Sequence, residues 1–155
     1  MRCSELLLGA LLLAGCDADA PAAASPPPPD GEDLQAVQAW LFDGDYLDWQ
    51  RHAPAPGMVG GAIVYLSPAL AASLHDGHSS HPLGAAAVRE LVSAESGEMI
   101  GWAYMLKLDD APDGDGWFFY EVFATTRDAA ANLAERGAPG CVGCHADGVD
   151  FIHAP

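Results

Sequence analysis

Five residues near the C-terminus constrain this 155-residue chain more than any other segment: Cys141-Val142-Gly143-Cys144-His145. A C-x-x-C-H box is typical of covalent attachment of a c-type haem. Its two thiols form thioethers with the vinyl groups of the porphyrin, and a tight turn brings the adjacent histidine to the iron. We therefore expect one covalent haem c on Cys141 and Cys144, with His145 as the proximal ligand of the metal.

The cysteine count agrees with this interpretation. The chain has four cysteines, and the first two, Cys3 and Cys16, lie near the N-terminus, outside any compact domain. Cys141 and Cys144 thus have no third thiol with which to build a four-cysteine zinc site or a disulfide network. A haem-free lipoprotein with a Cys141–Cys144 disulfide remains an alternative in an oxidising compartment. That alternative leaves the neighbouring His145 unexplained.

The N-terminus predicts export. Residues 1–15 contain one arginine, an apolar run and small residues, the pattern of a secretory signal peptide, and the run is too short to span a bilayer. Leu13-Ala14-Gly15-Cys16 resembles the lipobox of bacterial lipoproteins, which implies cleavage before Cys16 and acylation of its thiol. We expect a lipid-anchored protein of the bacterial cell envelope, held to membrane lipid through Cys16, with its domain in the periplasm or otherwise outside the cytoplasm.

Two segments follow the signal. Residues 16–33 are rich in alanine, proline and aspartate and predict a semi-rigid tether. Residues 34–155 are long enough for one compact domain.

The pattern of the domain predicts an α+β fold, a mainly antiparallel sheet with flanking helices and a C-terminal haem-attachment loop. Apolar periodicity and turn residues predict helices over 34–42, 68–74 (opened by Ser67) and 128–135 (opened by Thr126), and strands over 61–66, 85–93, 99–108 and 116–123. Alternating aromatic residues are expected to form one wall of the core: Trp102, Tyr104, Trp117, Phe119 and Phe123.

The net charge of −16, from 22 acidic and 6 basic residues, narrows the range of partners. Such a surface repels nucleic acid, so we expect no nucleic-acid partner. It suits solubility, and it can attract a basic redox partner protein.

Taken together, the order of motifs resembles the cytochrome P-460 family and the closely related cytochromes c-prime-beta. The resemblance runs from about Asp45 to the end, through residues 62–68, 82–91, 101–107 and 116–120, the haem box and Asp150-Phe151-Ile152. It implies a mono-haem c-type protein, often a homodimer, with His145 on one side of the iron. It also implies an open or weakly ligated distal face that takes small gaseous or nitrogenous ligands such as nitric oxide or hydroxylamine.

One position departs from that family. P-460 proteins carry a lysine that crosslinks to the porphyrin in a stretch similar to residues 86–91, where this chain has Arg89. A guanidinium stays protonated and is a poor nucleophile, so we expect neither the crosslink nor hydroxylamine oxidase activity, and the chain's status as an enzyme stays open. Arg89 is instead a distal-site candidate that can donate to a ligand or to a haem propionate, or else a charge on the solvent side of its strand.

A sixth iron ligand would make the protein a six-coordinate electron-transfer cytochrome. Met58, Met99 and Met105 are the thioether candidates, and strand alternation predicts Met99 and Met105 on the same face.

The remaining histidines predict less chemistry. His75, His78 and His81 are expected in a flexible surface loop, and His153 is expected to be exposed at the chain end.

Overall fold

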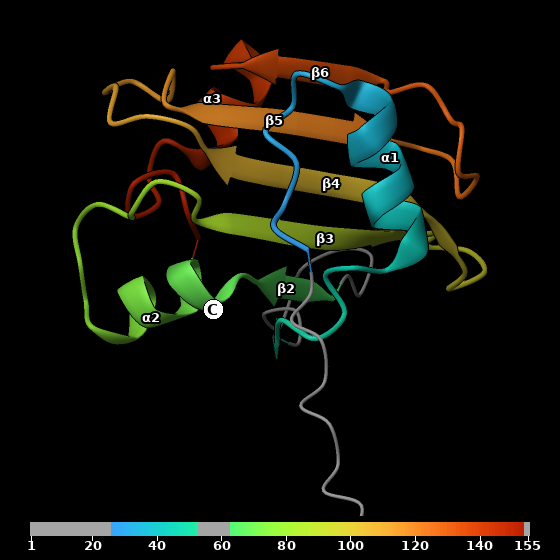
Figure 1. Ribbon diagram of the computed structural model, residues 1–155, viewed down its shortest axis with the longest axis horizontal. Coiled ribbons are helices and arrows are strands. Elements are labelled where there is room, and N and C mark those ends of the chain that lie inside the picture. Colours follow the sequence, from blue (N-terminus) through green and yellow to red (C-terminus); the bar gives the residue numbers. More distant parts are fainter. Residues whose placement is uncertain (1–25, 53–62, 154–155) are drawn as a thin grey trace, which may run out of the picture.

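The computed structural model describes residues 26–52 and 63–153 (Figure 1). The predicted signal peptide, the lipidation site Cys16, most of the tether and Met58 lie outside the described residues.

A six-stranded antiparallel sheet forms the centre of the molecule, and its strands are neighbours in the same order as in the sequence (Figure 1). The strands are β1 (Gln50–His52), β2 (Val64–Leu66), β3 (Ala86–Val92), β4 (Met99–Lys107), β5 (Trp117–Val122) and β6 (Leu133–Arg136). Helices α1 (Leu34–Asp43), α2 (Pro68–His75) and α3 (Pro139–His145) flank it. The predicted α+β class, mainly antiparallel with flanking helices, is confirmed.

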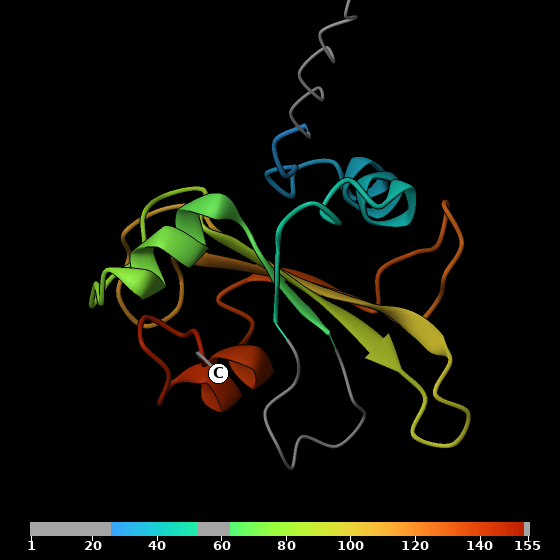
Figure 2. The ribbon, with the colours of Figure 1, turned by 90° about the horizontal axis from the view of Figure 1, so that it is seen from below.

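Both faces of the sheet are covered, because α1 and α3 lie on opposite sides of it (Figure 2). Along β5, Phe118 and Tyr120 join the cluster beneath α1, whereas Trp117 and Phe119 join the cluster beneath α3. This alternation places successive side chains in two different cores. The prediction of a single aromatic wall was wrong, since Tyr104 pairs with Tyr120 and so faces α1.

The helix predicted over 128–135 is the clearest error. Residues 133–136 form β6, which pairs with Phe118–Glu121 and covers the outer edge of β5. The alanine-rich segment favours a helix locally, but only by a few tenths of a kcal/mol per residue. Without β6, backbone N–H and C=O groups of the buried strand β5 would lack hydrogen-bond partners, which costs more. The short edge strand β1 at the other side of the sheet was not predicted.

A β-bulge separates the two methionines of β4. Leu91 pairs with Gly101 and Val92 with Met99, so Ile100 is an extra residue on β4. The chain passes so close to β5 here that a Cβ on Gly101 would lie 1.9 Å from the carbonyl oxygen of Val122. The extra residue shifts the alternation of β4, so that side chains before the bulge point to the opposite face from the one that alternation alone predicts. Met99 therefore packs on the α1 side and Met105 on the α3 side, and the prediction of a shared face was wrong.

Gln38 joins α1 to the sheet through a fully buried amide. Its Nε2 donates to the carbonyl oxygen of Thr126 at 2.5 Å, and its Oε1 accepts from the Tyr120 hydroxyl at 2.9 Å. We expect Gln38→Ala to lower the free energy of unfolding by roughly 1–3 kcal/mol, because it leaves the buried Tyr120 hydroxyl without its acceptor and removes the bond to Thr126. Chemical denaturation measures this. Gln35→Ala, on the exposed side of α1, is the control, and equal losses in both variants would contradict the role of Gln38.

Candidate functional site

The C-x-x-C-H box lies in a short helix and not in the predicted loop or tight turn. Pro139 opens α3 at its first turn, where the missing N–H costs nothing, and the helix runs through His145. Positions three and four apart share one face of a helix, so Cys141, Cys144 and His145 project in the same direction. Both cysteines are free thiols.

That common face lines a cavity of ≈ 330 Å³ between α3 and the sheet. The volume falls at the lower end of the range for small-molecule sites. Its walls are mostly apolar, and they include both box cysteines, His145, His153 and Ile152 on one side.

Two adjacent rows of side chains on the sheet form the opposite wall. The register aligns Val64, Arg89, Ala103, Glu121 and Leu133 in one row across five strands, and all five line the cavity. Leu66, Ala87, Met105 and Phe119 form part of the next row and line it too. The small Ala87 and Ala103 leave the middle of this wall hollow.

Arg89 lines the cavity and is half-buried. Its Nε is buried and has no hydrogen-bond partner. Arg89 and Glu121 flank Ala103, which places two opposite charges on one apolar wall, their backbones about 10 Å apart by strand spacing. Sequence reasoning missed Glu121. The available signal was an acidic residue within an otherwise aromatic and apolar strand.

His145 is half-buried and held in one tautomer. Its Nδ1 lies 2.8 Å from the carbonyl oxygen of Phe151, which can only accept, so Nδ1 carries the hydrogen and Nε2 keeps a free lone pair. Burial lowers the pKa of His145, although the bond to Phe151 opposes that shift. A neutral imidazole with Nδ1–H bonded to a carbonyl is the usual state of a metal-binding histidine.

The Cys141 thiol is held in its protonated form. Burial raises its pKa first, and the nearby Glu121 and Cys144 raise it further. A thiol with a raised pKa is a weak nucleophile and a poor ligand for a bare metal ion. Cys144 is exposed at the rim.

The other predicted histidines divide. His75 and His78 are exposed, as expected, but His81 is buried and the surface-loop prediction was wrong for it. His81 Nε2 donates to the Val149 carbonyl at 3.1 Å, and its Nδ1 accepts from the Ser73 hydroxyl at 2.9 Å. His153 is exposed, and its Nε2 lies 3.0 Å from the carbonyl oxygen of Cys144.

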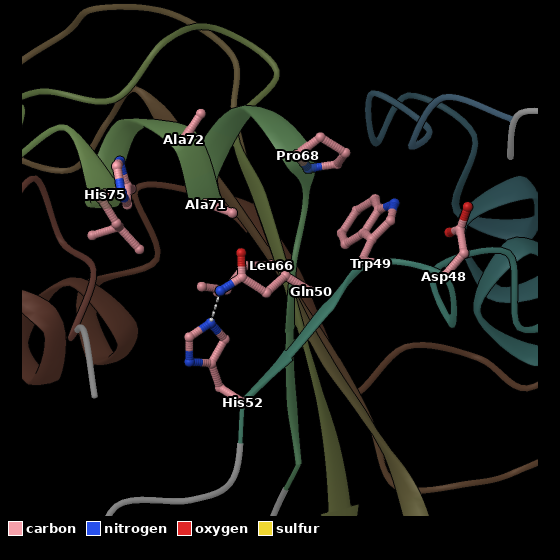
Figure 3. A pocket seen from close by; sticks show the side chains of 10 residues that line it. Asp48, Trp49, Gln50, His52, Leu66, Pro68, Ala71, Ala72 and His75 are labelled. Carbon is pink, nitrogen blue, oxygen red and sulfur yellow. Dashed lines mark hydrogen bonds between the residues drawn. The ribbon is translucent and has the colours of Figure 1, made fainter.

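A larger hollow of ≈ 680 Å³ lies between β1 and α2 and does not include the box (Figure 3). Three of its polar side chains have hydrogen-bond partners: Gln50 and His52 bond to each other at 2.9 Å, and His75 bonds to Asp76 at 3.0 Å. The chemically distinctive residues therefore gather in the smaller cavity.

Comparison of the chain with models of protein families gave no match, and comparison with curated proteins gave none. Within residues 26–52 and 63–153, no group of three or more histidine, cysteine or acidic side chains is arranged to hold a metal ion. Over the same residues, no helix combines the length and apolar character needed to cross a membrane.

His81 makes the stability of the fold depend on pH. Burial lowers its pKa below the usual 6.5. Between that value and the lowered pKa, the unfolded chain binds more protons than the folded one, so the free energy of unfolding falls as the pH drops below about 6.5. We expect His81→Gln to reduce this slope in denaturation curves. His75→Gln, at an exposed site, should keep the wild-type slope, and an unchanged slope in His81→Gln would contradict the assignment.

Proposed function

We propose that this chain is a lipid-anchored, extracytoplasmic mono-haem c-type cytochrome. In this proposal, Cys141 and Cys144 hold one haem c covalently and His145 is the proximal ligand. The haem then carries single electrons or takes a small nitrogenous or gaseous ligand on its distal side.

One observation carries the proposal: the two thiols and His145 share one face of α3 and line one cavity, and His145 Nδ1 is bonded to Phe151. This leaves Nε2 free to bind iron. The donor set also suits the group, because a porphyrin brings four of its own nitrogens to the iron and needs only an axial imidazole.

Each residue has a separate task in this proposal. Cys141 and Cys144 would hold the porphyrin through two thioether bonds, each formed by addition of S–H across a vinyl group without a change in oxidation state. His145 would bind the iron through its Nε2. The apolar wall excludes water, which strengthens any charge interaction inside the cavity.

Arg89 and Glu121 would set the polarity of the distal side. The unpartnered Nε of Arg89 can donate a charge-assisted hydrogen bond to a bound ligand or to a propionate. Glu121 can accept a proton from a protonated ligand. The haem, when bound, supplies the redox chemistry. Acylation at Cys16 would hold the domain at a membrane, facing a basic redox partner protein.

A second candidate is a six-coordinate electron-transfer cytochrome, which one observation favours. Met105 lines the same cavity as His145, so its thioether is within the same enclosure as the proposed iron site. An absorption spectrum separates the candidates: a high-spin ferrous band that shifts with nitric oxide supports the open site. A low-spin spectrum that turns high-spin in Met105→Leu supports methionine ligation.

Mass spectrometry tests the attachment itself. Protein purified from a host that matures c-type cytochromes should carry one haem on the peptide that contains Cys141 and Cys144, and the haem should resist extraction with acidified acetone. The Cys141→Ala/Cys144→Ala variant should lose the covalent haem. A wild-type mass equal to the bare chain minus two hydrogens would favour the haem-free disulfide alternative instead.

Arg89 should raise the affinity of the ferric protein for an anionic ligand. We expect Arg89→Leu to weaken azide binding by about 10-fold or more, the value of one lost charge-assisted hydrogen bond, measured by spectral titration. Arg51→Leu removes the same charge from the exposed strand β1 and is the matched control. Equal affinities in the two variants would show that Arg89 does not reach the distal side.

A further inference from the structure

The carbonyl group that orients His145 belongs to a turn that the local sequence does not favour. Val149 and Ile152 form an antiparallel bridge, and their backbones bond at 3.0 Å and 2.9 Å. The two residues between them, Asp150 (φ 46°) and Phe151 (φ 64°), are both left-handed, the pattern of a type I′ turn. Such turns are usually made by asparagine and glycine, and a phenylalanine there is strained.

A buried ion pair between Lys107 and Asp150 ties this turn to the end of β4. Lys107, at the end of β4, is the only lysine of the chain, and its side chain is 2 % exposed. Its Nζ lies 2.5 Å from Asp150 Oδ2 and 3.0 Å from Ser80 Oγ. A buried cation is tolerated only with partners, so the position of Lys107 fixes that of the Asp150 carboxylate.

His81 holds the same turn at two further points. Its backbone N–H donates to Asp150 Oδ2 at 2.7 Å, and its ring donates to the Val149 carbonyl. The backbone before the turn packs closely against the backbone after it, because a Cβ on Gly148 would lie 2.6 Å from the carbonyl oxygen of Ile152. Every contact that fixes Asp150 thereby fixes the next residue, Phe151, whose carbonyl faces His145.

We propose that the Lys107–Asp150 pair positions the axial ligand of the haem: it holds the strained 149–152 turn so that the Phe151 carbonyl keeps His145 in the Nδ1–H tautomer. This rests on the proposed haem function. The carbonyl bond makes the imidazole a stronger donor, which stabilises ferric over ferrous iron. Lys107 and Asp150 are positioning residues, because neither of them lines the cavity that contains the box.

The reduction potential distinguishes positioning from simple electrostatics. Loss of the His145 bond makes the potential more positive in every variant that breaks the pair. A change of charge alone acts with opposite signs: Lys107→Met would make it more negative and Asp150→Asn more positive. We therefore expect both single variants, and the charge-neutral Lys107→Met/Asp150→Asn double variant, to shift the potential in the positive direction.

Asp110→Asn is the matched control. Asp110 lies 3.8 Å from Lys107 Nζ, but its side chain is 78 % exposed and it lies outside the 149–152 turn. The Asp110→Asn variant removes the same charge as Asp150→Asn and should shift the reduction potential less. Opposite shifts in the two single variants, or equal shifts in Asp150→Asn and Asp110→Asn, would overturn the proposal. If Lys107→Met does not fold, the comparison of Asp150→Asn with Asp110→Asn decides the question.

Failure of the haem proposal is recognised separately. If the wild type takes up no haem, the proposed function fails, and the positioning role is read from the ¹⁵N NMR shifts of the His145 ring in the haem-free chain. The Nδ1–H tautomer should predominate in the wild type and in Asp110→Asn, and give way to a mixture in Asp150→Asn. The same tautomer in all three would overturn the role of the pair.

Discussion

The hydrogen bond between His145 and the carbonyl oxygen of Phe151 is the contact on which the candidate site depends. It joins the C-terminal end of α3 to a turn that lies six residues further along the chain. It decides which ring nitrogen carries a proton and which keeps a lone pair. Without it, the imidazole could rotate or change tautomer, and the common orientation of the box would no longer define a ligand-binding geometry.

The sheet supplies the rigid frame for this contact. On the α1 side, the Trp102 indole donates to the Tyr46 hydroxyl at 2.9 Å, and that hydroxyl donates to Glu90 at 3.0 Å. Burial raises the pKa of Tyr46, so it stays a neutral donor in this chain. On the α3 side, the small Ala87 and Ala103 lie among larger residues and leave room for the cavity.

The sequence predicted most of the elements that depend on local signals. Ser67 followed by Pro68 predicted the start of α2, and Ser67 Oγ does accept from the Leu70 N–H. The strands 85–93, 99–108 and 116–123 were placed within one or two residues, because alternation and turn residues are properties of short segments. The box cysteines and His145 were identified from their spacing alone, and the structure brings them to one cavity.

The remainder depends on contacts between distant segments. β6 replaces a predicted helix because the edge of β5 needs a hydrogen-bonding partner. The sequence of residues 128–135 contains no local signal for this pairing. The bulge at Ile100 follows from how closely Gly101 approaches Val122. His81 is buried because Ser73 and Val149 satisfy both of its ring nitrogens, and those partners are 8 and 68 positions away. Glu121 was missed because strand register, and not sequence, places it beside Ala103.

The most direct test is a crystal structure of the haem-loaded protein with data collected across the iron absorption edge. The account predicts a single anomalous peak within bonding distance of His145 Nε2, with density continuous from the porphyrin to Cys141 and Cys144. His145 Nδ1 should remain bonded to the Phe151 carbonyl. An iron peak that is absent, or bound to a different side chain in place of His145, would contradict the account.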